Sequence, residues 1–593
     1  MTPSLLERFW ADAEAGRALP PGASGAERVL REVHDAEMAI QLDVCRAKLE
    51  QARREELDAP FGRVRELLDL RVRIRAAKAE ELGDAAPRLR ALLASCTASE
   101  EATVARVWHT LAVLSLRVND ADTAEESLAN ALALVGDAPA RIWILDSWAQ
   151  HLMAIGAWHE ARRTLLKVLG LRSAAEDARG VAITGGHLAR LEMALGDAPA
   201  AKVILVPILA RWGEALEPLS RLRLQTGVVD ACLAASDPEL PAAASALEAA
   251  MGGACSGHYL EGYAAMALAK AAARRGDAAG AQRWFRVADA NIGLPDQRAL
   301  LRFAEAQVTP SLLDDAAWLA NVRTLFADAG HVTLAEVEIG ALLATRAKDA
   351  GNAEAARQHL DGAYRAATTA NNAAWFVRLD AVGSAVDPEG TTNRVLRRYS
   401  GRSFEEVHAT VREDVTIIFA DLVSFTPRVL ELPPDEVMET VRSLFEIAAS
   451  LLVKHHVRPL TCMGDGLLAV AQGPQHEARG LAFARDYVRR AARISVLRRT
   501  FGDVWGLDLR AGCASGLVVM GAIGSHLKLE FAAIGLTTNL ASRLQSAAEP
   551  GQVVAAERTA ADVRAEGVRE MLTLKGFKDP VAAVRFAVAT VHE

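Results

Sequence analysis

A recurring turn in the first two thirds of the chain constrains its fold more than any other feature. A Gly or Asn stands five positions before an Ala at Asn119, Gly156, Gly196, Gly276 and Gly351, and most intervals are about 40 residues or a multiple of that. The surrounding text also matches, as in LMAIGAWHEARRTLL, LEMALGDAPAAKVIL and AAARRGDAAGAQRWF. Each segment predicts a helix, a turn closed by a left-handed Gly or Asn, and a second helix that packs closely through its Ala.

A repeat of this length is typical of stacked helical hairpins. These segments resemble tetratricopeptide repeats, although the period is longer than the usual ~34 residues and the Trp and Tyr signature positions are poorly kept. We therefore predict a TPR-like all-α solenoid over residues 1–385. Its extended face would bind a protein or peptide partner that the sequence does not identify. The alternative is an irregular helical domain in which the turns recur by coincidence.

Composition limits the kind of protein further. Hydrophobic residues are 51% and charged residues 24% of the 593 positions, which is ordinary for a folded chain, and the net charge of -8 argues against nucleic-acid binding through bulk charge. The six cysteines are scattered and form no CxxC pair, which favours reduced thiols. We find no signal-peptide pattern, and the longest apolar run, near residues 203–208, is too short to span a membrane. We therefore expect a cytoplasmic protein with no membrane span.

The pattern changes after a break near VDPEGTTNRV, where Pro388 and Gly390 interrupt the helical text. We predict a connector over residues 386–412 and a second domain over residues 413–593, in which strands and helices alternate. DVTIIFADLVSF predicts a buried strand, and MGDG predicts a tight hairpin turn. The order predicts an α+β, ferredoxin-like domain with helices on one side of the sheet.

Two acidic residues in this domain point to metal binding. Asp421 ends the first predicted strand, and Asp465 stands at the tip of the following hairpin. If these strands are neighbours, both tips lie at the same end of the sheet. Two carboxylates in that position suit a pair of Mg²⁺ ions that also bind substrate phosphates.

Five motifs in this domain carry a family resemblance: FADLVSFT, MGDGLLAV, LRAGCASG, VVMGAIGS and IGLTTNLASRL. In this order and spacing, the region from about Arg412 to Glu593 resembles class III nucleotidyl cyclase catalytic domains. The resemblance implies an adenylate cyclase-like phosphorus-oxygen lyase. Such an enzyme converts a nucleoside triphosphate to a 3′,5′-cyclic nucleotide plus pyrophosphate, with two Mg²⁺ or Mn²⁺ ions per active site. It also implies a homodimer through the catalytic domain, with the ribbon of residues 516–535 as its dimerisation arm.

The resemblance assigns roles to the residues that match its motifs. Asp421, the backbone carbonyl of Leu422 and Asp465 match metal ligands, while Asn539 orients the ribose and Arg543 stabilises charge on the transferring phosphate. In this family one protomer supplies the aspartates of a site and the other supplies the Asn/Arg pair.

The triphosphate-binding positions match as well. They are Phe425 and Thr426 in the turn after the first Asp, Arg510 in LRAGCASG, and Lys575 in LKGF. Ser424 departs from the pattern, because the family usually has Gly there.

The base pocket also departs from the family pattern. Adenylate cyclases usually have Lys where Thr461 stands and Asp or Thr where Ala532 stands, and guanylate cyclases have Glu and Cys. Three explanations remain: ATP held by backbone contacts and packing, another nucleotide base, or a degenerate pseudo-cyclase that serves as a dimeric TPR-like scaffold or sensor. The intact metal and Asn/Arg positions favour an active enzyme, with ATP as the most favoured substrate and the helical repeats as its regulator.

Overall fold

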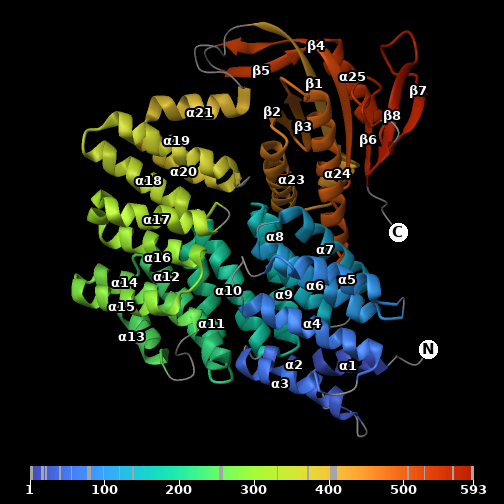
Figure 1. Ribbon diagram of the computed structural model, residues 1–593. Helices are drawn as coiled ribbons and strands as arrows, with labels where there is room; N and C mark the ends of the chain where they lie inside the picture. Colours follow the sequence, from blue (N-terminus) through green and yellow to red (C-terminus); the bar gives the residue numbers. More distant parts are fainter. Residues whose placement is uncertain are drawn as a thin grey trace. The chain divides into compact units, whose positions relative to one another are not determined.

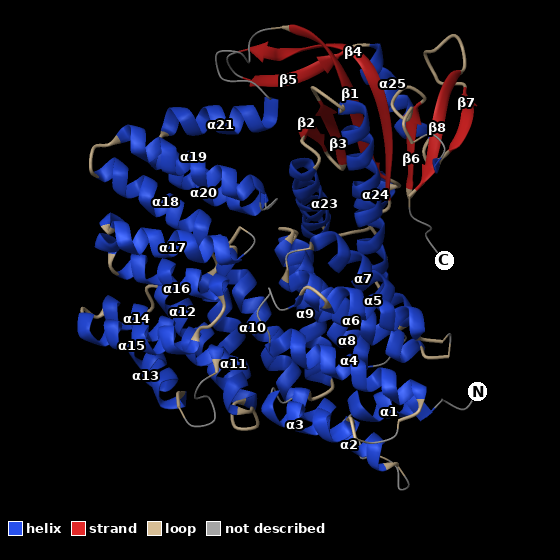
Figure 2. Cartoon of the chain, in the orientation of Figure 1, coloured by secondary structure: helices blue, strands red, loops and turns tan. Residues whose placement is uncertain are grey.

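The computed structural model gives the structure of the chain. It describes residues 5–14, 19, 23–38, 42–54, 57–76, 82–97, 99–118, 120–135, 139–252, 258–329, 332–369, 373–400, 410–503, 506–525, 528–563 and 566–588. The chain divides into two compact units, one formed by Met1–Ala154 and Glu160–Thr333 and the other by Ile155–His159 and Leu334–Glu593. Among the described residues, every regular element before Val411 is a helix (Figure 2).

The first unit is built from helices α1 to α17 and the 3-10 helix η3 (Figure 1). Their bounds are α1 Leu5–Glu14, α2 Gly25–Met38, α3 Leu42–Ala52, α4 Ala59–Ala76, α5 Ala85–Ser95, α6 Glu101–Arg117, α7 Ala121–Leu134, α8 Pro139–Ala154, α9 Trp158–Ala174, α10 Ala178–Ala194, α11 Ala198–Trp212, α12 Pro218–Ala235, α13 Leu240–Ala250, α14 Tyr259–Arg274, α15 Ala278–Asn291, α16 Pro295–Val308, η3 Pro310–Asp314 and α17 Ala316–Ala329.

The even-numbered helices from α6 to α16 form a continuous layer. Each contacts the next even-numbered helix, so that α6 touches α8, α8 touches α10, and the series continues to α16. Sequential helices pack together as well, as α10 does with α11 and α14 with α15. Helical hairpins are therefore stacked side by side through this stretch, while their likeness to tetratricopeptide repeats stays a prediction.

The recurring turns have the predicted backbone geometry. Gly156, Gly196, Gly276 and Gly351 have φ between +77° and +86°, in the left-handed region that glycine adopts without strain. The alanines that follow them by five positions are buried, at most 2% exposed. Asn119 lies outside the described residues.

Two further turns of the same kind carry no glycine. Ser236 has φ 53° and Glu176 has φ 52°, and each precedes an Asp in the sequence. Asp177, Asp197 and Asp277 accept a backbone N–H of the next helix, which fixes where that helix begins. Ser236 fills the gap between Gly196 and Gly276, so the repeat of about 40 residues continues where the sequence pattern skipped a period.

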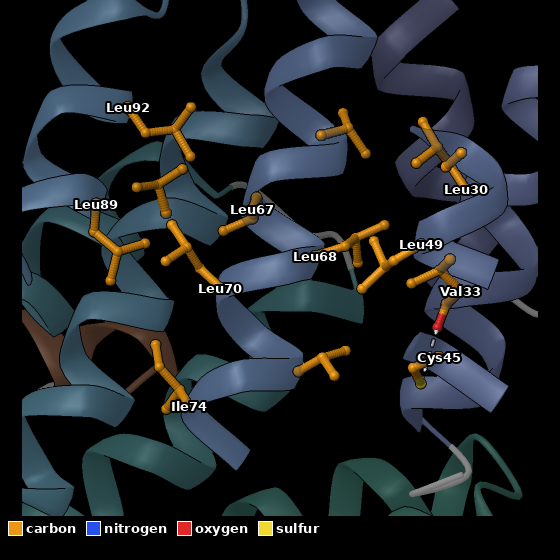
Figure 3. Packing of buried hydrophobic residues seen from close by; sticks show 14 of the residues in the cluster. Leu30, Val33, Cys45, Leu49, Leu67, Leu68, Leu70, Ile74, Leu89 and Leu92 are labelled. Atoms are coloured by element: carbon orange, nitrogen blue, oxygen red, sulfur yellow. Dashed lines mark hydrogen bonds between the residues drawn. The ribbon is translucent and has the colours of Figure 1, made fainter. Parts of the chain in front are cut away.

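The first helices share an apolar core. Leu30, Leu67, Leu68 and Leu89 are fully buried, and their side chains interdigitate between α2, α4 and α5 (Figure 3). This packing excludes water from the centre of the bundle and supplies most of its stabilisation.

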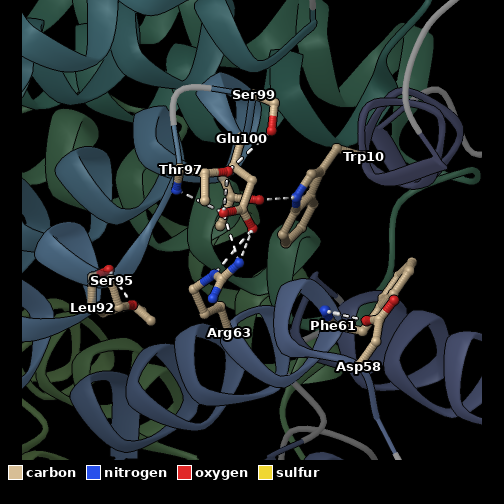
Figure 4. Close-up of polar contacts among 10 residues, drawn as sticks. Trp10, Asp58, Phe61, Arg63, Leu92, Ser95, Thr97, Ser99 and Glu100 are labelled. Atoms are coloured by element: carbon tan, nitrogen blue, oxygen red, sulfur yellow. Dashed lines mark hydrogen bonds and ion pairs between the residues drawn. The ribbon is translucent and has the colours of Figure 1, made fainter.

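Buried polar contacts link the same helices. Glu100, which is 4% exposed, accepts a two-pronged ion pair from Arg63 of α4 at 2.7 Å and a hydrogen bond from the backbone N–H of Thr97 (Figure 4). The indole N–H of Trp10 in α1 donates to the hydroxyl of Thr103 in α6 at 3.0 Å. Because each buried polar group has a partner, these contacts fix how α1, α4 and α6 pack.

The second unit contains four further helices and a sheet domain. The bounds are α18 Leu334–Asp349, α19 Ala353–Thr369, α20 Ala373–Val386, α21 Pro388–Ser400, β1 Val411–Leu422, α22 Phe425–Val429, α23 Pro434–Lys454, β2 Val457–Met463, β3 Gly466–Ala471, α24 His476–Thr500, β4 Leu509–Ser525, β5 Lys528–Ile534, α25 Leu536–Ala547, β6 Gln552–Ala556, β7 Val568–Leu572 and β8 Val581–Ala587.

The eight strands form one sheet in the order β2-β3-β1-β4-β6-β8-β7, with β5 paired to β4. The β4 and β6 strands are parallel, and the other pairs are antiparallel. Alternate residues of β1 face opposite sides of this sheet. Thr416 and Ile418 lie against Gly480 of α24, whereas Ile417 and Phe419 belong to the apolar cluster that includes Ala541 of α25.

Helices therefore cover both faces, and the expectation that they lie on one side was wrong. The reason is Gly512 on β4, which pairs with Phe419 and leaves room for the backbone of α25 to rest directly on the sheet.

The predicted fold class is confirmed: an all-helical region is followed by an α+β sheet domain. The boundaries at residues 385 and 412 stay a prediction, and residues 401–409 of the connector lie outside the described residues. Within the described parts of the chain, no helix combines the length and the apolar character that crossing a bilayer requires. Five cysteines are free thiols, and Cys255 lies outside the described residues.

Candidate active site

The candidate site lies where β1 ends next to the β2–β3 hairpin. Ala420 pairs with Leu467 across β1 and β3, which places Asp421 beside the hairpin turn that carries Asp465. Gly464 has φ 60° and closes this turn. The two predicted metal-binding carboxylates are thus brought together by strand register and a tight turn.

The two carboxyl groups are within hydrogen-bonding reach of each other. The pKa of Asp465 is raised to about 7, first by burial, then by the hydrogen bond with Asp421 and by its negative charge. The backbone N–H groups of Asp465 and Leu422 both donate to the Asp465 carboxylate and oppose this rise. Two carboxylates at this separation repel each other when both are ionised, and a bound cation would offset that repulsion.

Two other side chains contact Asp421. A guanidinium nitrogen of Arg510, directly opposite on β4, lies 3.8 Å from its Oδ2 atom, and a second Arg510 nitrogen lies 3.5 Å from the carbonyl oxygen of Ala548. Nε2 of Gln545 on α25 donates to the same Oδ2 atom over 3.4 Å. The Nε atom of Arg510 is buried and has no hydrogen-bond partner among the described residues.

Gln545 is a residue that the sequence interpretation missed. Its side chain is 7% exposed and lies on the face of α25 that packs on the sheet, next to Ala541 and Leu544. A polar residue on the buried stripe of a predicted helix would have been the signal.

Asn539 and Arg543 lie on α25 but face away from Asp421. Both are exposed, and neither side chain makes a hydrogen bond or ion pair with any described residue. Positions 543 and 545 are about 200° apart around a helix, so one chain cannot direct both Gln545 and Arg543 to the same carboxylate. The structure therefore does not bring the Asn/Arg pair to the carboxylates of its own chain.

The remaining triphosphate-binding candidates are spread along the same domain. Phe425 begins α22 and is half-buried, whereas the side chain of Thr426 lies outside the described residues. Ser424 has φ 60°, the left-handed backbone that explains why glycine is expected at this position. Lys575 is exposed in the loop between β7 and β8.

The two base-pocket positions lie on neighbouring strands. Thr461 is half-buried on β2, next to a register shift after Pro459, and Ala532 is half-buried on β5 opposite Gly521. The β2 and β5 strands touch each other. Neither side chain offers a charged group that could read a purine edge.

Comparison with known proteins assigns the sheet domain to a family. Residues 407–579 match the family model described as the adenylate and guanylate cyclase catalytic domain. This part of the chain is therefore a class III cyclase catalytic domain, as the sequence motifs predicted.

Known relatives include both kinds of cyclase. A receptor-type guanylate cyclase, gcy-7 of Caenorhabditis elegans, is 30% identical over 149 residues, which cover 24% of this chain and 13% of that protein. An adenylate cyclase of Mycobacterium tuberculosis (strain ATCC 25618 / H37Rv) is 28% identical over 145 residues, covering 24% of this chain and 31% of that protein. Among solved structures, the guanylyl cyclase Cya2 has 25% identity and a TM-score of 0.28, over 30% of this chain and 92% of that one. The chain thus spans only a minor part of these curated relatives.

Proposed function

We propose that the C-terminal domain is an active nucleotide cyclase that converts a nucleoside triphosphate, with ATP favoured, to a 3′,5′-cyclic nucleotide and pyrophosphate. The observation that carries this proposal is the pair Asp421 and Asp465, held within hydrogen-bonding reach at one end of the sheet and flanked by Arg510. Two carboxyl groups held so close that the pKa of one is raised to about 7 destabilise the folded chain when no ligand is bound. It is expected where a charged ligand is bound.

The carboxylates fit the implied Mg²⁺ or Mn²⁺ ions. Among the described residues, no group of three or more His, Cys, Asp or Glu side chains is placed to hold a metal. Asp421, Asp465 and the Leu422 carbonyl would therefore share the ions with phosphate oxygens of the substrate, as Mg²⁺ commonly does. The bound ions would stabilise negative charge on the attacking and leaving oxygens.

The residues of the chain itself would position the substrate. Arg510 and Lys575, with the turn at Phe425 and Thr426, would bind the triphosphate, and the rigid guanidinium of Arg510 suits a phosphate group. Bound in this way, the α-phosphate can stand in line with the ribose 3′-oxygen, so that attack by this oxygen expels pyrophosphate.

The Asn/Arg pair would come from a second copy of the chain. Asn539 and Arg543 are exposed and lack partners among the described residues. In a two-fold dimer these side chains can reach the carboxylates of the other protomer, where Asn539 orients the ribose and Arg543 stabilises charge on the phosphate. A single copy would then be inactive.

Base selection would rest on Thr461 and the backbone near Ala532. Because neither residue is charged, we expect weaker discrimination between purine bases than in a site where two polar side chains form hydrogen bonds with the base. ATP remains the favoured substrate.

The helical repeats over residues 1–385 would regulate this reaction through the connector at 386–412. Binding of a protein or peptide partner would change the relative angle of the two catalytic domains of a cytoplasmic homodimer. A variant that begins at Gly401 lacks the helical repeats and tests this idea. If its basal cyclase activity, and the change in that activity when cell extract is added, both equal those of the full chain, regulation by the repeats is refuted.

The direct test of the proposed activity is product analysis. The purified chain is incubated with equal amounts of ATP, GTP, CTP and UTP in the presence of Mg²⁺ or Mn²⁺, and mass spectrometry identifies any cyclic nucleotide. We expect cyclic AMP as the larger product with some cyclic GMP beside it, and both should be lost in Asp421→Ala and kept in Asp562→Ala, which removes an exposed carboxylate of the same domain. If all four triphosphates stay intact while the protein dimerises, a pseudo-cyclase scaffold becomes the better account.

A further inference from the structure

Two arginines in the helical unit lie close together, and neither forms an ion pair with a described carboxylate. Arg190 is near the end of α10, and Arg223 is in the second turn of α12, a helix that contacts α10. The Cδ atom of Arg223 lies 3.6 Å from where a Cβ at Gly186 of α10 would stand. Neither guanidinium makes a hydrogen bond or ion pair with any residue that the structure describes.

The surrounding protein strengthens the effect of these charges. Arg190 is exposed, yet its pKa is lowered, first by desolvation and then by the charge of Arg223. Charges interact more strongly where protein replaces bulk water. The pKa of His187 is also lowered, mainly by desolvation and further by Arg190 and Arg223, so this histidine is neutral at pH 7 and adds no charge of its own.

Two carboxylates lie near this region, but neither forms an ion pair with Arg190 or Arg223 among the described residues. Asp146 of α8 is buried, lies 3.0 Å from Nδ1 of His187, and accepts the hydroxyl of Thr184 at 2.8 Å. Asp296 of α16 acts on the charge of Arg117, a third arginine near Tyr259, and its negative charge also raises the pKa of Tyr263. The buried charge of Asp146 acts on Arg190 from a distance, but the two arginines still form a region of excess positive charge within the stacked helices.

Two tyrosines border this region. Tyr259 and Tyr263 lie one turn apart on α14, with ring centroids 6.2 Å apart in an edge-to-face arrangement, and Tyr259 is 39% exposed. Both tyrosines lie close enough to Arg190 to act on its charge. Neither hydroxyl makes a hydrogen bond with a described residue, so both can donate to a ligand.

We propose that Arg190 and Arg223, together with the hydroxyls of Tyr259 and Tyr263, form a binding site for a small oxyanion ligand. The shared chemistry is a carboxylate or phosphate group, because a guanidinium presents parallel donors that match both. A bound anion would offset the repulsion between the arginines and hold α10, α12 and α14 together. The site is distinct from the catalytic residues and does not depend on the proposed cyclase activity.

The test is ligand-dependent thermal stability of the full chain. The probes are inorganic phosphate and succinate, each compared with sodium chloride at the same ionic strength, and calorimetric titration measures Kd. The Arg190→Ala/Arg223→Ala double variant removes the proposed site. Arg275→Ala, in the exposed turn after α14, removes one positive charge of the same unit and serves as the control.

We expect at least one probe to raise the unfolding temperature of the wild type and of Arg275→Ala. The double variant should be no less stable than the wild type without probe, because it loses a like-charge repulsion, and its Kd should be about tenfold higher or more. A larger response to phosphate identifies a phosphate-bearing ligand, and a larger response to succinate identifies a carboxylate. The proposal is overturned if neither probe exceeds the chloride control, or if the double variant responds like the wild type.

Discussion

At the scale of single residues, the pair Asp421 and Asp465 sets the chemistry of the candidate site. Strand register was enough to predict that both would lie at one sheet end. Their hydrogen bond and the raised pKa of Asp465 could not be predicted, because they depend on burial and on backbone N–H directions that no spacing encodes.

The raised pKa gives a pH prediction for the metal-free protein. The folded chain holds the Asp465 proton up to about pH 7, whereas the unfolded chain releases it near pH 3.8. The contribution of this group to the free energy of unfolding is therefore fully present below pH 4 and is lost as the pH rises from 4 to 7. Over that pH range, the free energy of unfolding of the wild type should fall by roughly 2 kcal/mol relative to that of Asp465→Asn. This figure is reduced for solvent screening, because the group is partly exposed.

Thermal unfolding in EDTA between pH 5 and 8 measures this difference. The gap between wild type and Asp465→Asn should grow up to about pH 7 and then stay constant. A difference that is the same at every pH would show that the pKa of Asp465 is not raised in the folded chain.

Gln545 gives a second prediction at this scale. Its amide donates to Asp421 and would orient that carboxylate toward the metal. Gln545→Leu should weaken Mn²⁺ binding by about 10- to 100-fold, the usual effect of removing a hydrogen bond to a metal ligand.

Calorimetric titration with Mn²⁺ provides the measurement. Gln472→Leu, which removes a glutamine that donates to Glu413 instead, is the matched control and should bind like the wild type. Equal Mn²⁺ affinity in both variants would exclude a positioning role for Gln545.

At the scale of elements, packing of α25 on the sheet depends on Gly512. A Cβ at this position would overlap the backbone nitrogen of Gln545 and the carbonyl oxygen of Ala541. Gly512→Ala should therefore destabilise the domain by about 3 kcal/mol, at the upper end of overpacking effects.

Chemical denaturation checks this value. Gly170→Ala, inside α9 four residues before its end and with no atom within 4 Å of the added Cβ, should instead stabilise the chain by about 0.5–1 kcal/mol. Equal behaviour of the two variants would mean that α25 does not rest on the sheet at Gly512.

Some of the turns between helices could be predicted from the sequence and others could not. Gly196 and Gly276 are visible in the text because glycine is the residue suited to a left-handed turn. Ser236 and Glu176 adopt the same left-handed backbone at some energetic cost, because the helices on either side hold them there. Neither residue type indicates such a turn, so the sequence did not predict these two turns. The same limit applies to α25, whose choice of sheet face depends on the absence of a side chain at Gly512.

At the scale of the whole molecule, the account requires two copies of the chain. Asp421 and Asp465 converge in one copy, while Asn539 and Arg543 of that copy face outward from α25. The family motifs implied this division between protomers, and the outward face of α25 gives it a physical basis.

Mixing two inactive variants tests this division most directly. Asp421→Ala and Arg543→Ala are each expected to be inactive alone. After the two are denatured, mixed in equal amounts and refolded together, half of the dimers should contain one of each chain, with one intact site per mixed dimer. Cyclic nucleotide formation should then return to about a quarter of the wild-type rate. If the mixture stays inactive although mixed dimers form, the shared site does not exist and the account is contradicted.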